Sequence, residues 1–128
     1  MAKKFYITTS IPYLNGAPHL GFALEVVQAD SLARYRRLFL EDVFFLSGSD
    51  EHGATIVRAA EKAGKNPKEF VDEQVLKFLG LLEKLNISNN DFIRTSDQKR
   101  HWFGAQELWK KMESAGDIYK GFYNGLYC

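Results

Sequence analysis

The feature that most constrains this chain is a loop of Pro, Asn and Gly residues, 11–21, between an apolar run and a long amphipathic stretch. The apolar run at 5–9 is typical of a buried strand, and the amphipathic stretch that begins near His19 is typical of a helix. The loop therefore delivers His19 and Gly21 to a helix N-terminus, where free N–H groups attract anions. A glycine lets a ligand approach the backbone, and a histidine can donate a hydrogen bond to phosphate oxygens. This arrangement favours a polyphosphate site.

Strand and helix patterns alternate along the rest of the chain. A continuous apolar run predicts a second strand, buried as in a parallel sheet, and apolar residues at helical spacing predict the helices. The expected elements are strands at 4–9 and 43–46, and helices at 19–39, at 54–63, after Asn66 with a stripe that reaches Leu85, and at 97–114.

Several of these helices carry clear end signals. Asn66 suits an N-cap, Pro67 suits the first helical position, and Glu69 follows three residues after the cap. Gly64 and Gly116 suit the positions just after the last turn of the helices that precede them.

The last third of the chain is predicted in less detail. Thr95 and Gln98 form a possible capping box for the helix at 97–114. The expected buried face of this helix consists of Trp102, Ala105, Trp109 and Met112. The tail at 117–128, rich in Tyr, Phe and Gly, is predicted to form a hairpin.

The order strand–helix–strand–helix predicts an α/β fold with a doubly wound parallel sheet. In such sheets, ligands bind beyond the carboxyl ends of the strands. The loops at 10–21 and 47–53 both follow strands, so we expect them to converge on one crevice. The second loop offers Asp50 and Glu51, whose carboxylates suit an ammonium group, a ribose hydroxyl or Mg²⁺.

Composition excludes several classes of protein. The 128 residues fit one domain or part of one, and the formal net charge of +1 gives no global field typical of a nucleic-acid binder. No apolar run is long enough to span a bilayer, and the first residues lack the apolar core of a signal peptide. A single cysteine excludes an internal disulfide framework. Together these observations favour the cytoplasm and no membrane partner.

Residues 8–21, Thr-Thr-Ser-Ile-Pro-Tyr-Leu-Asn-Gly-Ala-Pro-His-Leu-Gly, closely resemble the nucleotide-binding signature of class I methionyl-tRNA synthetases. Further agreement with that family follows in the same order, at 28–30 with 34–35, at 47–53 and at 125–128. Because four motifs keep their order, the resemblance covers essentially the whole chain and implies the N-terminal part of a Rossmann-like catalytic domain.

The resemblance also implies roles for single residues. His19 and Gly21 match the pair that binds ATP and stabilises the transition state of adenylate formation. Phe22 stands where the signature normally has a second histidine; it cannot donate a hydrogen bond but can pack against an adenine or ribose face. Asn15 and Glu25 lie on the ATP side. Ile11, Tyr13 and Asp50 match positions that bind methionine, with Asp50 on its ammonium group.

Each role has a structural alternative. A histidine at a helix N-terminus is often without a ligand, and Gly21 can serve helix–strand packing alone. Asp50 can cap the helix that follows it, Tyr13 can serve loop packing, and His52 is better interpreted as structural.

The string Gly-Leu-Tyr-Cys opens an inserted connective domain in this family, which often binds zinc through pairs of cysteines. The resemblance therefore divides the chain into residues 1–116, half of the catalytic domain, and 117–128, the start of the insertion. Cys128 would be the first zinc ligand of a longer parent, and this chain alone has no metal site. The family's lysine-rich loop is absent, so we expect a fragment.

The implied function is that of a methionine–tRNA ligase. Methionine and ATP, the latter with Mg²⁺, would give methionyl-adenylate, and methionine would then pass to tRNA. Two other classes stay open. One is an ATP- or partner-binding module without ligase activity, and the other is a nucleotidyltransferase of the His-x-Gly-His group.

Overall fold

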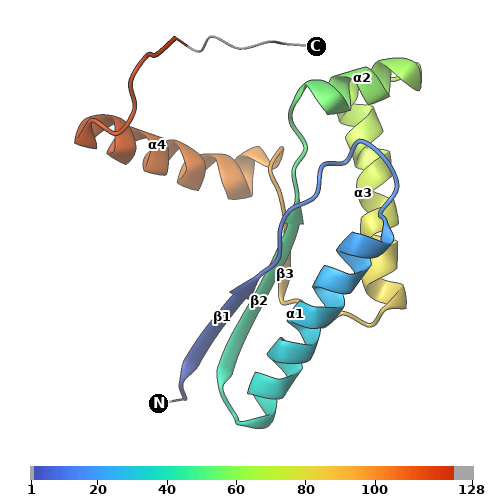
Figure 1. The fold of residues 1–128 in the computed structure, drawn as a ribbon, viewed down its shortest axis with the longest axis vertical. Helices are drawn as coiled ribbons and strands as arrows, with labels where there is room; N and C mark the ends of the chain where they lie inside the picture. Colours follow the sequence, from blue (N-terminus) through green and yellow to red (C-terminus); the bar gives the residue numbers. More distant parts are fainter. Residues whose placement is uncertain (1, 123–128) are drawn as a thin grey trace.

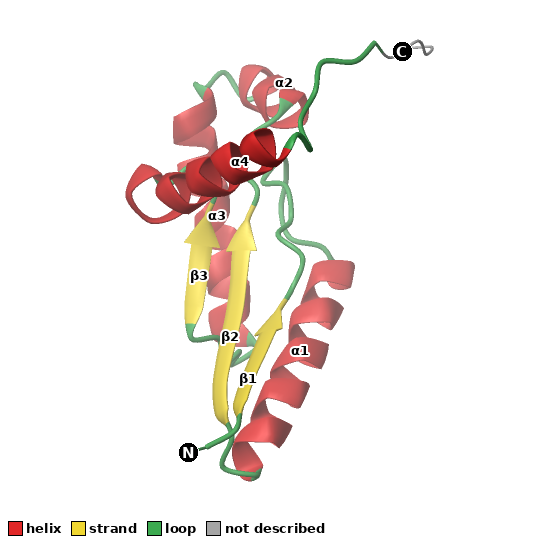
Figure 2. Ribbon diagram, turned by 90° about the vertical axis from the view of Figure 1, so that its left-hand side faces the viewer, coloured by secondary structure: helices red, strands yellow, loops and turns green. Residues whose placement is uncertain are grey.

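The computed structural model describes residues 2–122, in which three strands form one parallel sheet in the order β1-β2-β3. All three strands point toward the end that carries α2, α4 and the loop after β1 (Figures 1 and 2). The elements are β1 (Lys4–Thr8), α1 (Leu20–Leu38), β2 (Asp42–Ser49), α2 (Ala54–Lys62), α3 (Pro67–Lys84), β3 (Asp91–Arg94), the π-helical turn η1 (Gln98–Trp102) and α4 (Phe103–Ala115).

Helices α1 and α3 cover one face of the sheet (Figure 1). Strand side chains alternate between faces, so Val43 and Phe45 of β2 point under these helices and pack with Ala33 of α1. Phe45 has no exposed surface. Burial of such side chains from water stabilises the layer by about 1.5–3 kcal/mol each, and it fixes α1 against the strands that precede and follow it.

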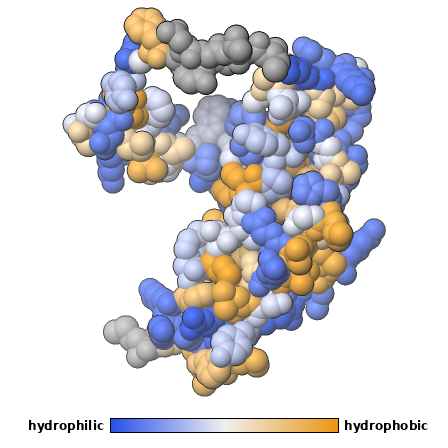
Figure 3. Space-filling view, viewed as in Figure 1, coloured by the Kyte–Doolittle hydropathy of each residue, from blue (hydrophilic) through white to orange (hydrophobic). Residues whose placement is uncertain are grey.

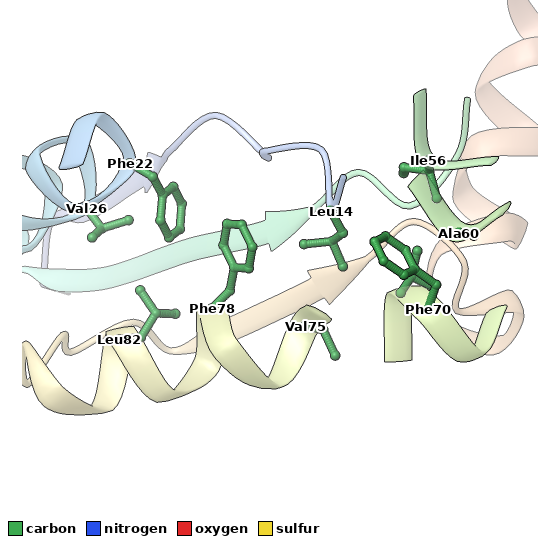
Figure 4. Packing of buried hydrophobic residues seen from close by; sticks show 10 residues of the cluster. Leu14, Phe22, Val26, Ile56, Ala60, Phe70, Val75, Phe78 and Leu82 are labelled. Atoms are coloured by element: carbon green, nitrogen blue, oxygen red, sulfur yellow. The ribbon is translucent and has the colours of Figure 1, made fainter. Parts of the chain in front are cut away.

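A second cluster joins α1, α2 and α3 and includes Leu14 from the loop after β1 (Figure 4). The rings of Phe22 and Phe78 meet edge to face at 5.2 Å between centroids. Leu14 is fully buried, and its side chain therefore anchors the loop to the helical layer. The loop between β1 and α1 is thus held by the same core as the helices.

A buried carboxylate fastens α1 to the segment before β3. Asp30 accepts hydrogen bonds from the Ser88 N–H at 2.7 Å and from the Arg34 Nε at 2.6 Å. Burial alone would raise the pKa of Asp30, but the bonds from Ser88 and Arg34 outweigh it and hold the pKa below its usual range. This contact places two of the family-like residues of α1 in a structural role.

The predicted order of the first two strands and three helices is confirmed. Asn66 caps α3 by accepting the Glu69 N–H at 2.9 Å, and Pro67 is its first residue. Gly64 and Gly116 end α2 and α4 with positive φ angles of 68° and 82°. Strand β3 was not predicted, because its four residues are too few to show a period.

One face of the sheet carries exposed aromatic rings. Tyr6 and Phe44 stack at 6.0 Å between centroids, with 62% and 46% of their surfaces exposed. The prediction that residues 43–46 are continuously buried is therefore wrong at Phe44. Among residues 2–122, α1 and α3 cover only the opposite face, and the strand itself is longer than predicted, extending to Ser49.

The predictions for the segment around α4 need correction. Asp97, not Thr95, caps the helical segment, because its carboxylate accepts the N–H groups of Lys99 and Arg100. Thr95 instead accepts the Glu51 N–H. The predicted helix is divided into η1 and α4, and its expected buried face is exposed: Trp109 by 58% and Met112 by 40%, with Trp102 and Ala105 also exposed.

The reason is that α4 lacks a partner element in the described part of the chain. Its substantial contacts are with η1, and the surface view shows it separated from the strands by an open hollow (Figure 3). Residues 117–122 form no strand, and the rest of the predicted hairpin lies outside the described residues, as does Cys128. Within 2–122, no helix has both the length and the apolar character needed to cross a membrane.

Gly48 offers a direct test of the β2–β3 packing. A Cβ at this position would lie 2.5 Å from the Ile93 carbonyl oxygen and 3.0 Å from Ile11 Cγ2. We expect Gly48→Ala to lower the free energy of unfolding by about 1–3 kcal/mol, because β3 must move. Urea unfolding followed by circular dichroism measures it.

The matched control is Gly80→Ala, at a position in α3 where a Cβ would meet nothing within 4 Å. Alanine favours a helix interior over glycine, so this variant should gain up to about 1 kcal/mol. Equal effects of the two substitutions would contradict the packing at Gly48.

Candidate functional site

His19 is the N-cap of α1. Its Nδ1 accepts the Phe22 N–H at 3.3 Å, and its backbone is extended. Because Nδ1 is an acceptor, the proton of the neutral ring is on Nε2. The side chain is exposed, so Nε2–H is available as a donor beside the helix N-terminus.

Gly21 allows the His19 ring to take this position. A Cβ on Gly21 would lie 2.9 Å from His19 Cε1 and 3.0 Å from Nδ1, closer than a ring and a methyl group pack. A side chain at residue 21 would therefore displace the ring. The two residues act as a unit, because the glycine provides the space that the capping histidine occupies.

Hydrogen bonds between Ser10 and the Glu25 carboxylate, here called the Ser10–Glu25 clamp, also hold the loop. The Ser10 N–H and the Ser10 hydroxyl donate to the two carboxylate oxygens of Glu25, each at 2.6 Å. Glu25 lies near the start of α1, so these bonds tie the segment just after β1 to the first turns of the helix. Both oxygens of Glu25 already have a partner, which makes the side chain a fastener of the loop in this conformation.

These residues line one hollow of about 350 Å³ at the carboxyl end of β1. It combines the N-terminus of α1, the exposed His19 ring and the polar side chains of the loop. Of the predicted site residues, this hollow brings together Tyr13, Asn15, His19, Gly21, Phe22 and Glu25. Phe22 lies at its base and is 3% exposed, because its ring packs on Phe78 in the core.

Asp50 and Ile11 do not line this hollow, but main-chain pairing holds them close to it. The Asp50 N–H donates to the Pro12 oxygen at 2.9 Å, and the Leu14 N–H donates to the Asp50 oxygen at 3.2 Å. The two bonds lie on either side of Tyr13, which forms a parallel bridge with Asp50. The two loops are therefore joined through the main chain, but the predicted single crevice does not form, because the loop at 10–21 lines this hollow whereas Glu51 and His52 line a separate one. Ile11 packs over Gly48.

The Asp50 carboxylate is not a helix cap. The N-cap of α2 is Gly53, which provides no side-chain hydrogen bond. Asp50 Oδ1 accepts the His52 N–H at 3.2 Å within its own turn. Its Oδ2 has no hydrogen bond among the described residues, and the side chain is partly exposed. The carboxylate therefore retains an acceptor for an external donor.

Glu51 is buried beside this turn, and its side chain has no exposed surface. Arg94, at the end of β3, donates from Nε to Oε1 at 2.7 Å and from Nη2 to Oε2 at 2.9 Å. Ser49 and Ser96 donate their hydroxyls to the same carboxylate. The hydrogen bonds that Arg94 donates to Glu51 raise its pKa the most, and those to Asp72 raise it further. Together they hold the pKa of Arg94 well above its usual range despite burial.

A larger hollow of about 600 Å³ lies on the other side of this ion pair. Glu51, His52 and Arg94 line it together with Trp102 of η1, but the predicted ATP and methionine residues do not. Its lining mixes acidic and basic groups that are mostly paired with each other. The smaller hollow, with its exposed histidine and free helix N-terminus, is the better candidate for a nucleotide.

The described residues contain no group of three or more His, Cys, Asp or Glu side chains placed to hold a metal ion. His52 contacts the Thr95 hydroxyl at 3.3 Å through Nδ1. This contact agrees with the structural role expected for His52.

Sequence reasoning missed the roles of Ser10 and Arg94, and it assigned Thr95 to a helix cap instead of to the turn at Glu51. Ser10 lies inside the quoted signature, and its partner Glu25 is fifteen positions away, so only the fold shows the clamp. Arg94 is the last residue of β3 and Thr95 follows it, and the sequence did not predict this strand. Had the third strand been recognised, an arginine at its end would have suggested a partner for the carboxylates that follow the second strand.

A parallel β–α–β unit with a His-x-Gly pair at the helix N-terminus, beyond the end of its first strand, defines an α/β domain of the Rossmann type. Residues 5–128 match the family described as tRNA synthetases class I (M), and the chain belongs to that family.

Similar proteins agree with this assignment. The methionine–tRNA ligase of Thermotoga maritima is 51% identical over 125 residues, which cover 98% of this chain and 20% of the relative. The ligase of Brucella suis is 47% identical, with 98% and 24% covered. The solved structure of Mycobacterium tuberculosis methionyl-tRNA synthetase in complex with methionyl-adenylate superposes with a TM-score of 0.88 at 44% identity, over 91% of this chain and 23% of that one.

The chain thus spans about a fifth to a quarter of the length of the relatives it matches. The predicted fold class, the N-terminal part of a Rossmann-like catalytic domain, is confirmed. The division into 1–116 and 117–128 stays a prediction, as do the roles of the single site residues.

The cap geometry makes a testable claim about His19. In ¹⁵N NMR spectra of the histidine-labelled chain, the neutral ring should be protonated on Nε2, because Nδ1 accepts the Phe22 N–H. In the Gly21→Ala variant the Phe22 amide should exchange faster, since the new methyl group displaces the ring that accepts its hydrogen bond. A ring protonated on Nδ1 in the unmodified chain would show that the cap is not formed.

Proposed function

We propose that this chain is the nucleotide- and methionine-binding half of the catalytic domain of a methionine–tRNA ligase. The observation that supports this most strongly is the joining of two loops. A hollow with a free histidine N–H and a helix N-terminus lies beside an aspartate with an unpaired oxygen, and two main-chain hydrogen bonds fix them together. Amino-acid activation needs an anion site beside a carboxylate, because its substrates are a polyphosphate and a zwitterion.

On the ATP side, His19 Nε2–H would donate to a phosphate oxygen as negative charge develops, assisted by the N-terminus of α1. Gly21 keeps the ring in place. Asn15 would contact the nucleotide at the rim, whereas Glu25 would act on the ATP side by holding Ser10 of the loop. Phe22 would offer little surface to the nucleotide, since it is 3% exposed and part of the core.

On the methionine side, the free Asp50 oxygen would accept a hydrogen bond from the α-ammonium group. Tyr13 and Ile11 would line the pocket for the methionine side chain. The methionine carboxylate would then attack the α-phosphorus in line, the bond to pyrophosphate would break, and methionyl-adenylate would form. The protein contributes positioning and charge stabilisation and no covalent intermediate. Transfer to the terminal adenosine of tRNA would follow, in the cytoplasm.

Mg²⁺ would enter with the triphosphate, because residues 2–122 contain no cluster of metal ligands of their own. It would neutralise charge on the leaving pyrophosphate. A zinc site that begins at Cys128 would need ligands beyond this chain.

The proposal is tested by ATP–pyrophosphate exchange with and without methionine. Two proteins are compared: the chain alone, and a chimera in which it replaces the matching part of the Thermotoga maritima ligase, chosen for its 51% identity. We expect methionine-dependent exchange by the chimera, and a fall of about a hundredfold or more in its His19→Ala variant, because a donor to the developing charge is lost.

His101→Ala is the matched control, since His101 lies in η1 outside the hollow, and it should leave exchange unchanged. A chain that binds ATP and methionine but exchanges only as part of the chimera is an incomplete catalytic half. A folded chimera without methionine-dependent exchange would overturn the proposal and favour a binding module.

A further inference from the structure

The buried carboxylate of Glu51 is unusual for a residue next to a candidate substrate ligand. Its side chain is fully buried, and it accepts hydrogen bonds from Ser49, Ser96 and, through two atoms, Arg94. All of these donors come from the ends of β2 and β3. None of them lines the hollow at His19.

A buried charge of this kind fixes geometry more than it adds stability. Removing a carboxylate from water is costly, and the cost is offset only when the partners occupy their places together. Arg94 is itself held from α3, because Asp72 Oδ1 accepts its Nη2 at 2.6 Å. The Glu51 carboxylate therefore has one well-defined socket, formed by two strands and one helix.

The main chain transmits this position to Asp50. The Thr95 N–H donates to the Ser49 oxygen at 3.2 Å, and the Glu51 N–H donates to the Thr95 hydroxyl at 2.8 Å. Asp50 lies between these anchors, and its own N–H and oxygen pair with Pro12 and Leu14. Residues 49–51 are thus held by Thr95 on one side and by Pro12 and Leu14 on the other.

We infer that the Glu51–Arg94 ion pair positions Asp50. The pair fixes the main chain of residues 49–51, and the main chain in turn fixes the direction of the free Asp50 oxygen and the position of Tyr13. The part of this inference that concerns methionine rests on the proposed function. Neither Glu51 nor Arg94 touches the substrate in this account, so both are positioning residues.

The contacts predict a selective effect. The ATP-side geometry depends on the Ser10–Glu25 clamp and on the His19 cap, and neither includes Glu51. Loss of the ion pair should therefore weaken methionine binding and leave ATP binding unchanged. A residue that only stabilised the fold would affect both ligands together.

The test compares Glu51→Gln with Asp72→Asn in the full 128-residue chain. The first replaces an acceptor oxygen by an NH₂ group that faces its donors, while the second removes the other carboxylate on Arg94 and leaves all Glu51 contacts in place. Amide hydrogen exchange followed by NMR is measured at Asp50 and Leu14. We expect exchange about tenfold faster or more in Glu51→Gln, because charge-assisted bonds are lost, and a smaller increase in Asp72→Asn, which loosens Arg94 but keeps every contact of Glu51.

Ligand titrations then give the second readout. In Glu51→Gln, the Kd for methionine should rise about tenfold or more, while the Kd for ATP stays the same. Arg94→Lys keeps the charge but loses the two-atom contact, so it should show a smaller effect of the same kind. This variant decides the question if Glu51→Gln fails to fold, as judged from exchange at the core amide of Phe45.

Two results would overturn the inference: unchanged exchange at Asp50 and Leu14, or equal losses of methionine and ATP affinity. Failure of the proposed function looks different. In that case the unmodified chain and the chimera bind no methionine, and the exchange measurement still shows whether Glu51 holds the turn.

Discussion

The arrangement of the site depends on one pair of main-chain hydrogen bonds, those that join residues 12–14 to Asp50. Without them, the loop after β1 and the turn after β2 would be two separate loops at a sheet edge. The pair is supported from both sides. Leu14 is buried in the helical core, and Glu51 is buried between the strand ends. The buried side chain of Leu14 and the buried ion pair of Glu51 thus hold the two polar loops in fixed positions. The groups that would face ligands stay exposed.

Because some side chains anchor the loops and others stay available for ligands, neighbouring residues have opposite environments. Tyr13 is exposed and Leu14 is buried, just as Asp50 is accessible and Glu51 is not. Loops that bind ligands carry few main-chain partners of their own, so their precision must come from side chains inserted into rigid elements. Each of the two loops here combines an inserted side chain with an adjacent one that stays available.

Much of this could be predicted from the sequence, for identifiable reasons. The helix α3 was placed by its cap because Asn66, Pro67 and Glu69 act locally. That the two loops lie side by side follows from the parallel sheet, since carboxyl ends of parallel strands meet at one edge. His19 was singled out by its place at a helix N-terminus and Asp50 by its place after the second strand, and the family resemblance implied their roles.

The remainder depended on contacts that sequence periodicity does not contain. Strand β3 is four residues long, and its arginine became visible as a partner of Glu51 only in three dimensions. The face of α4 that carries Trp109 has a helical period like that of a buried helix, yet it is exposed among residues 2–122. Periodicity predicts that a face is apolar, but whether another element covers that face depends on the tertiary fold.

The most direct test of the central claim is a titration of the ¹⁵N-labelled chain with a non-hydrolysable sulfamoyl analogue of methionyl-adenylate, followed by NMR. One ligand that spans both loops should shift the amides of residues 10–22 and 49–53 together, with a single saturable affinity, and leave α4 unchanged. Shifts confined to the hollow beside Trp102, or no saturable shifts at all, would contradict the claim that the two loops form one site.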